Sequence, residues 1–162
     1  MCCTRWIRCS APAPSPNCIA GWPTMPEPSA PTGPVRVCAG ADLLDGGLGV
    51  RFPVEVRGRA VGAFVVRYAG DVHGYLNQCA HVPMEMDWQE GQFFEGSGLY
   101  LMCATHGAIY EPDTGRCVGG PCRGAHLTKL DVTERDGGVW WQPDALCRLP
   151  AAPEPAPVPP VA

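Results

Sequence analysis

Short runs of apolar and β-branched residues, separated by glycine-rich turns, fill the middle of the chain. Val, Phe and Tyr recur in these runs, which is typical of β-strands. No stretch keeps a 3.6-residue apolar period beyond about ten residues, so we expect helix only as a turn or two, near 41–44 or 83–89. The pattern predicts strands at 35–39, 49–56, 60–68, 72–77, 99–103, 107–110, 127–133 and 139–142. This is an all-β domain of antiparallel strands, with a hairpin turn at Asp136-Gly137-Gly138.

The prolines divide the chain into three parts. Of the 19 prolines, eight lie in residues 1–34 and six in residues 150–162, and only five lie between them. Such ends cannot bury enough apolar surface to offset the entropy lost on ordering. We therefore expect a disordered Pro/Cys-rich leader at 1–34, one folded domain at 35–149 and a disordered Pro/Ala tail at 150–162.

Charge and hydropathy exclude several classes of function. The formal net charge is −4 and Lys129 is the only lysine. A nucleic-acid binder needs clustered cations, so we expect none here. No run of 18 apolar residues indicates a membrane span, and no secretory signal is recognisable at the start, so we expect no membrane association and a cytoplasmic protein. In that compartment cysteines indicate metal or redox chemistry more often than disulfides.

Two short motifs carry the candidate chemistry. Cys79-Ala80-His81 is a C-x-H motif, and after an interval of 21 residues Cys103-Ala104-Thr105-His106 is a C-x-x-H motif. Two Cys and two His can close a structural zinc site. They can equally hold a [2Fe–2S] cluster with both Cys on one iron and both His on the other. The spacing favours the cluster, because zinc sites more often pair Cys with Cys and His with His in one loop.

Around these motifs the sequence resembles the Rieske iron–sulfur family. The resemblance covers about residues 50–142 and is strongest in CAHVP, CATHGAIYEPDTGRC and GGPC. The family's second box continues with a glycine and an aromatic residue, here Gly107 and Tyr110. A third loop containing a proline, here Pro121, covers the cluster in that family.

The resemblance implies the fold, the cofactor and the role. It implies stacked antiparallel sheets with an inserted cluster-binding subdomain at about 78–123. It implies one [2Fe–2S] cluster per chain, with Cys79 and Cys103 on the inner iron and His81 and His106 on the outer. It also implies a ferredoxin-like carrier, without catalytic residues of its own, that passes single electrons between a reductase and an oxygenase or other redox partner.

Departures from the respiratory members of the family refine this expectation. Met84 and Thr105 stand where those proteins carry a bracing disulfide, and Ala108 replaces a serine that donates to a bridging sulfide. Tyr110 matches the respiratory tyrosine whose hydroxyl bonds to a cysteine ligand. These features point to a soluble ferredoxin or dioxygenase type.

Two further features of the cluster segment have functional and structural readings. Cys117 and Cys122 flank the proline and could form a local disulfide, act as a redox sensor or simply fill space beneath the cluster. Between Cys79 and Cys122, six acidic residues face Arg116 alone. This balance predicts a partner with a basic docking face, against the alternative of an ordinary solvated surface.

Other functions remain open alternatives. An oxygenase subunit that acts on substrate needs a mononuclear iron held by two His and a carboxylate, and only His73 and His126 remain for it. We expect these two histidines to be structural, and Cys38 and Cys147 to be fillers. A Rieske-bearing subunit resembling that of nitrite reductase and a structural Cys2His2 zinc domain are the further alternatives.

Overall fold

The computed structural model describes residues 33–150 of the chain. The disorder predicted for the two proline-rich ends therefore falls almost entirely outside the described residues. Strands dominate the described part, and its single helical element is the 3-10 turn η1 (Gly40–Asp42), beside the turn predicted at 41–44. The all-β fold class is confirmed.

The largest sheet has five antiparallel strands in the order β11-β2-β3-β4-β8. Tight turns join its three long strands. Arg57 and Gly58 both adopt positive φ between β2 and β3, and so do Ala69 and Gly70 between β3 and β4. Two consecutive residues of positive φ match the right-handed twist of the flanking strands, so each turn fixes the register of its hairpin. The strands are β2 (Val50–Val56), β3 (Arg59–Tyr68), β4 (Asp71–Leu76), β8 (Lys129–Leu130) and β11 (Cys147–Arg148).

A second antiparallel sheet packs against one face of the first. It contains β1 (Val35–Ala39), β10 (Gly138–Trp141) and β9 (Val132–Arg135), in that order. The predicted hairpin joins β9 to β10, with Asp136 and Gly137 at positive φ. Trp141 is buried between the sheets and its ring centroid lies 5.5 Å from that of Phe52.

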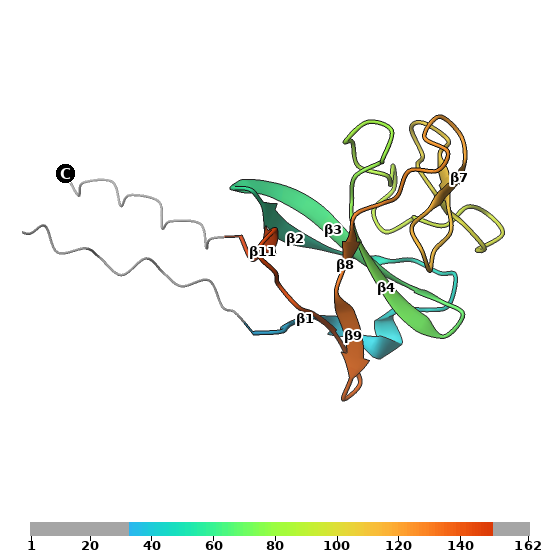
Figure 1. The fold of residues 1–162 in the computed structure, drawn as a ribbon. Helices are drawn as coiled ribbons and strands as arrows, with labels where there is room; N and C mark the ends of the chain where they lie inside the picture. The colour runs from blue at the N-terminus through green and yellow to red at the C-terminus, as the bar shows by residue number, and fades with distance from the viewer. Residues whose placement is uncertain (1–32, 151–162) are drawn as a thin grey trace, which may run out of the picture.

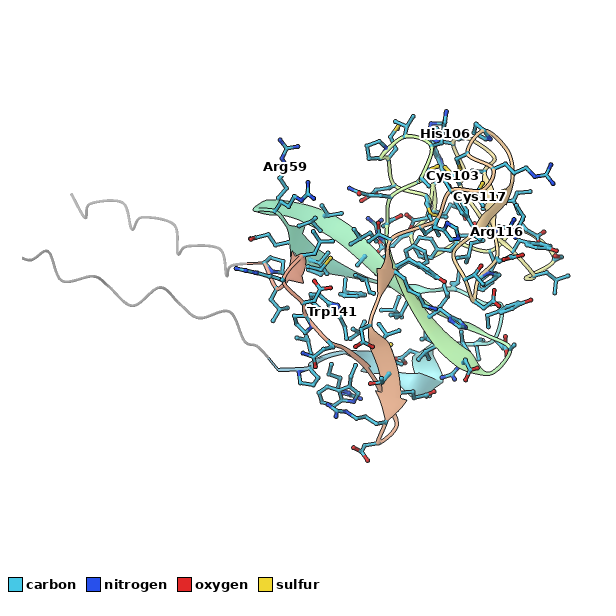
Figure 2. All side chains as sticks on the ribbon, viewed as in Figure 1. Arg59, Cys103, His106, Arg116, Cys117 and Trp141 are labelled. Atoms are coloured by element: carbon cyan, nitrogen blue, oxygen red, sulfur yellow. The ribbon has the colours of Figure 1, made fainter. Side chains whose placement is uncertain are left out.

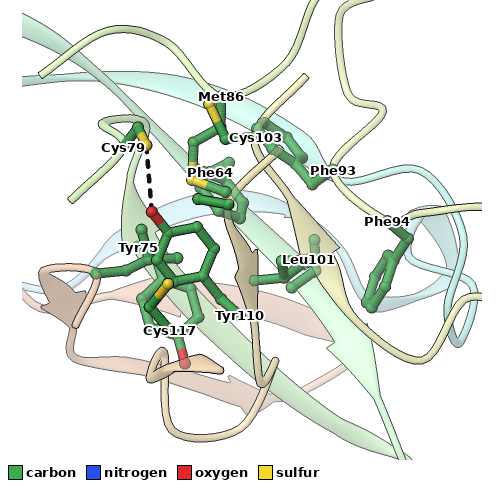
Figure 3. Packing of buried hydrophobic residues seen from close by; sticks show 13 residues of the cluster. Phe64, Tyr75, Cys79, Met86, Phe93, Phe94, Leu101, Cys103, Tyr110 and Cys117 are labelled. Carbon is green, nitrogen blue, oxygen red and sulfur yellow. Dashed lines mark hydrogen bonds between the residues drawn. The ribbon is translucent and has the colours of Figure 1, made fainter. Parts of the chain in front are cut away.

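The third sheet is much smaller and belongs to a lobe at one end of the molecule. It contains β5 (Leu101–Met102), β6 (Ile109–Tyr110) and β7 (Cys117–Gly119), and the chain enters this lobe after β4 and leaves it before β8. Figure 1 shows its loops at the upper right, above β3 and β4. Phe64 of β3 stacks on Phe93 of the lobe with ring centroids 3.7 Å apart, so one apolar core runs from the large sheet into the lobe (Figure 3). The boundaries predicted for a subdomain at 78–123 stay a prediction.

Several features differ from the sequence expectation. The single strand predicted at 127–133 is divided into β8, which belongs to the large sheet, and β9, which belongs to the second sheet. Segment 83–89 forms bends and no helix, because its backbone bonds to its own loop and to its neighbour: the N–H of Cys79 donates to the Met84 carbonyl at 2.9 Å, and that of Ala104 donates to the Met86 carbonyl at 2.8 Å. Strands β7 and β11 have three and two residues and were not predicted. Within residues 33–150 no helix has the length and apolar character needed to cross a membrane.

Candidate metal centre

The first loop of the site, residues 77–86, begins where β4 ends. Asn77 is buried and its side chain joins the two ends of this loop. Its Nδ2 donates to Asp87 at 2.8 Å, and its Oδ1 accepts the backbone N–H of Met86 at 2.8 Å. The other oxygen of the buried Asp87 accepts the N–H of Gly91 at 2.9 Å. This closed polar network places Cys79 beneath the lobe surface and His81 at it, and sequence reasoning did not identify either of its side chains.

The second loop, residues 103–108, connects β5 to β6. The N–H of Cys103 donates to the Ala108 carbonyl at 2.9 Å, and the N–H of Gly107 donates to the Cys103 carbonyl at 2.8 Å. Gly107 has φ +64, a conformation that glycine adopts without strain. This tight turn brings the ring of His106 back over its own cysteine, with Nδ1 3.4 Å from Cys103 Sγ.

The two loops bring the predicted ligands together. One ligand atom each of Cys79, Cys103 and His106 lies within 4.8 Å of the others, with both cysteines buried. His81 is exposed, and its ring centroid lies 4.9 Å from that of His106 in an edge-to-face arrangement at 82°. Two thiols therefore lie inside the lobe, and two imidazoles lie nearer its surface. Figure 2 labels one residue of each kind, Cys103 and His106.

Tyr110 of β6 organises the inner side of this site. Its hydroxyl lies 3.2 Å from Cys79 Sγ and accepts the N–H of Ala80 at 3.1 Å (Figure 3). Burial alone would raise the pKa of Cys79, but hydrogen bonds from Tyr110 and from the N–H of His81 outweigh it and lower that pKa to about 7. Burial raises the pKa of Cys103. A lower pKa favours the thiolate, which is the form in which cysteine binds metals.

The loop that contains Pro121 lies directly against the second loop. At Gly120, φ is +87, and a Cβ there would meet Ala108 Cα at 2.8 Å and the Gly107 carbonyl oxygen at 2.9 Å. Only a glycine permits this close approach of two backbones. Pro121 itself is exposed at the lobe surface.

Two further cysteines and two further histidines near the lobe lie outside the group of Cys79, Cys103 and His106. Cys117 and Cys122 are free thiols with their sulfurs 3.1 Å apart. His73 is half-buried in β4, and His126 is exposed and pairs through its backbone with Arg116. Within the described part of the chain, no second group of three or more His, Cys, Asp or Glu side chains could hold a metal.

Comparison with known proteins identifies the family of this site. The family model of the Rieske [2Fe-2S] domain matches residues 33–134. The ferredoxin of carbazole 1,9a-dioxygenase from Nocardioides aromaticivorans IC177 aligns with a TM-score of 0.54 and 25% identity, over 68% of this chain and 98% of that ferredoxin. No curated protein sequence matches this chain.

Two more distant structures share the fold. One is a complex of reduced oxygenase and oxidised ferredoxin in carbazole 1,9a-dioxygenase, with a TM-score of 0.52 and 21% identity over 67% of this chain and 92% of the matched chain. The other is the terminal oxygenase of carbazole 1,9a-dioxygenase from Nocardioides aromaticivorans IC177. It aligns with a TM-score of 0.53 and 19% identity, over 69% of this chain but only 30% of the oxygenase.

Proposed function

Because this chain belongs to the Rieske [2Fe-2S] domain family, we propose that it is a ferredoxin-like carrier that passes single electrons between a reductase and an oxygenase. The observation that carries the proposal is the paired imidazoles at the lobe surface, 4.9 Å apart, above two buried thiols. An electron-transfer group needs an edge that a partner can approach, and it needs a dry interior on its other side.

The donor set fits a [2Fe–2S] cluster. We assign Cys79 and Cys103 to the inner iron, because their thiols are buried on the core side of the lobe. We assign His81 and His106 to the outer iron, because their rings lie side by side nearer the surface. When bound, the cluster supplies a couple that accepts and releases one electron.

The protein's own residues set the conditions for this chemistry. The Tyr110 hydroxyl can donate to Cys79 Sγ, which stabilises negative charge on that sulfur. Phe64, Met86 and Leu101 are fully buried in the core cluster that contains the two thiols, so they exclude water from the inner side. Gly107 and Pro121 belong to the two loops that pack against each other beside the imidazoles.

The partner we propose is an oxygenase with a basic docking face, met in the cytoplasm. The complex of oxygenase and ferredoxin among the similar structures supports the class of partner. Glu85 lies in the first loop, is 55% exposed in its side chain and pairs with Arg51, and the exposed Glu90 follows that loop. These two carboxylates support the sign of the charge. If opposite charges steer the encounter, the second-order rate of electron transfer falls as ionic strength rises.

Cofactor analysis of the purified protein tests the assignment directly. We expect about two iron atoms and two acid-labile sulfides per chain, and an EPR signal on reduction with the low average g value of a histidine-ligated cluster. Replacing His81 or His106 by Ala abolishes that signal, whereas His126→Ala, the matched control, leaves it intact. A colourless protein with one zinc ion contradicts the proposal.

The alternative of an oxygenase domain has one discriminating observation. The described fold corresponds to 98% of a ferredoxin but to 30% of an oxygenase chain. The share of each matched chain that aligns therefore favours a ferredoxin-like carrier over an oxygenase domain. Mixing the reduced protein with a candidate aromatic substrate and dioxygen decides between them: a carrier is reoxidised without forming a hydroxylated product.

A further inference from the structure

Four side chains of the lobe form a continuous line of polar contacts that ends at a proposed cluster ligand. Cys117 and Cys122 lie with their sulfurs 3.1 Å apart, and Cys122 Sγ is 3.2 Å from the Tyr110 hydroxyl. The same hydroxyl lies 3.2 Å from Cys79 Sγ. The thiol pair therefore shares one hydroxyl group with the metal centre (Figure 3 shows Cys117, Tyr110 and Cys79).

Counting protons along this line fixes the direction of each bond. Cys117 donates its S–H to the Gly119 carbonyl at 3.1 Å, and Cys122 donates its S–H to Cys117 Sγ. Each thiol has one proton, so Tyr110 must be the donor to Cys122 Sγ. A thiolate at Cys79 can only accept. The single hydroxyl proton of Tyr110 is thus divided between two sulfur acceptors.

We propose that Cys117 and Cys122 are a redox-active dithiol that closes to a disulfide and thereby sets how strongly Tyr110 donates to Cys79. The proposal rests on the proposed function, because it describes the regulation of that same centre. A small-molecule disulfide such as oxidised glutathione is the class of oxidant.

The exchange balances in two steps. Cys122, half-buried and the more accessible thiol, attacks one sulfur of the small disulfide as a thiolate, so its proton is released and one small thiolate leaves. Cys117 is 1% exposed, and burial raises its pKa to about 11, so it is poorly suited to attack first. Cys117 then loses its proton, attacks the Cys122 sulfur and expels the second small thiolate. The pair loses two electrons and two protons, and the small disulfide gains both.

The local backbone favours closure. Cys117 N–H donates to the Ala125 carbonyl at 2.7 Å, Gly124 N–H donates to the Cys117 carbonyl at 2.8 Å, and Ala125 N–H donates to the Cys122 carbonyl at 2.9 Å. These bonds hold both ends of the proline loop together in the dithiol. The two sulfurs, 3.1 Å apart in the dithiol, must approach by about a further ångström, because a disulfide bond is about 2.05 Å long.

Closure also changes the hydrogen bond to the ligand. A sulfur drawn toward a second sulfur and bonded to it is a poorer acceptor for Tyr110 than a free thiol. The hydroxyl proton then goes to Cys79 alone, which favours the reduced, more negative state of the centre. We expect the disulfide form to have a higher reduction potential than the dithiol form.

Trypsin isolates the pair for a direct test. Arg116 and Arg123 bracket a peptide, residues 117–123, that contains these two cysteines and no others. The holoprotein is incubated with oxidised glutathione, quenched in acid, unfolded, alkylated and digested. We expect this peptide to become two hydrogen atoms lighter and unalkylated while the visible absorbance of the cluster persists, whereas Cys147 stays alkylated.

Three results would overturn the inference at this stage. They are a peptide that remains fully alkylated, a glutathione adduct on Cys122 that never resolves, and a bridge that forms only after the cluster absorbance is lost. In Cys122→Ser we expect Cys117 to remain available to alkylation. Because the readout is the mass of a peptide, it stands even if electron transfer to an oxygenase fails.

Voltammetry tests the coupling to the centre. We expect the midpoint to move to a higher potential on oxidation of the pair, and this movement to vanish in Tyr110→Phe. Cys147→Ser, a buried cysteine in the sheet core away from the lobe, serves as the control and keeps the wild-type response. A movement that survives in Tyr110→Phe, or a lower potential in the disulfide form, refutes the shared-proton argument.

Discussion

Two glycines of the proline loop offer a matched test of how this loop holds the second ligand loop. Gly120 and Gly124 have nearly the same positive φ, +87 and +92. An added Cβ at Gly124 meets nothing within 4 Å. At Gly120 it meets Ala108 Cα at 2.8 Å and the Gly107 carbonyl oxygen at 2.9 Å, and both obstacles are backbone atoms that no rotamer change can remove.

Both substitutions to alanine therefore have the same cost from the backbone conformation, and only Gly120→Ala has a further cost from steric overlap. The left-handed conformation costs an alanine about 1–2 kcal/mol at either position. Forcing a methyl group into an occupied backbone contact adds about 1–3 kcal/mol at Gly120 only. We expect Gly124→Ala to lower the free energy of unfolding by about 1–2 kcal/mol and Gly120→Ala by about 2–5 kcal/mol.

Urea denaturation measures these values, and the decay of the cluster absorbance in a chelator reports on the site itself. Gly120→Ala pushes the proline loop away from Gly107 and Ala108, so we expect faster cluster loss in this variant and a near wild-type rate in Gly124→Ala. Equal destabilisation and equal loss rates in the two variants would refute the argument, because the backbone contact would then contribute nothing.

Three further substitutions test the Asn77 network, the Tyr110 hydroxyl and the half-buried His73. Asn77→Leu leaves the N–H of Met86 and one oxygen of Asp87 buried without a partner, so urea denaturation should show a loss of about 2–5 kcal/mol; a loss under 1 kcal/mol contradicts this reasoning. Tyr110→Phe removes a donor worth about 0.5–1.5 kcal/mol to the sulfur of a cysteine ligand, so voltammetry should show a potential lower by about 20–65 mV. Burial, aided by a nearby lysine, lowers the pKa of His73 in the folded protein. Protonation of His73 therefore favours the unfolded chain. The free energy of unfolding should fall as pH drops from about 6.5, the pKa in the unfolded chain, to the lower pKa of the folded state. His73→Gln should flatten that part of the stability profile, and an unchanged slope contradicts the assignment.

The strands that could be predicted from the sequence are those whose own residues favour them. Residues 35–39 were predicted as a strand and form β1, and the other long strands differ by a residue or so at their ends. β-Branched and aromatic side chains recur in these segments, and tight turns bound them. The pattern that predicts each strand therefore lies within the strand's own residues. β11 is different. Its two residues, Cys147 and Arg148, have no such pattern, and they form a strand because they meet Val56 and Glu55 at the edge of the large sheet.

Site residues divide in the same way. Each Cys–His couple lies within one loop, so its spacing is visible in the sequence. Asn77 and Asp87 are ten residues apart, and both residue types are more typical of turns and surfaces than of buried networks. Nothing local indicates that they close the first loop. An asparagine at the end of a strongly apolar strand is the signal that could have drawn attention to it.

The net charge around the site differs when it is counted along the sequence and when it is counted among residues that are close in space. Counting along residues 79–122 sets six acidic residues against Arg116 alone. In space, Arg51 of β2 bonds to Glu85 at 2.6 Å and approaches Asp87 at 3.6 Å. Asp87 is also buried and presents no charge to a partner. The acidic surface available for docking is therefore smaller than the count along the chain indicates, and the salt dependence of electron transfer should be correspondingly shallow.

The lobe combines structural and functional roles in the same contacts because its sheet is so small. Strands of two or three residues supply few ladder hydrogen bonds, so side chains must hold the loops in place. Tyr110 packs in the core and also bonds toward Cys79, while Asn77 closes the loop that presents His81. A ligand group that joins cysteines from both loops adds its binding free energy to this same assembly. Substitutions in the lobe are therefore expected to change stability and redox behaviour together, whereas those between the two larger sheets, around Trp141, change stability alone.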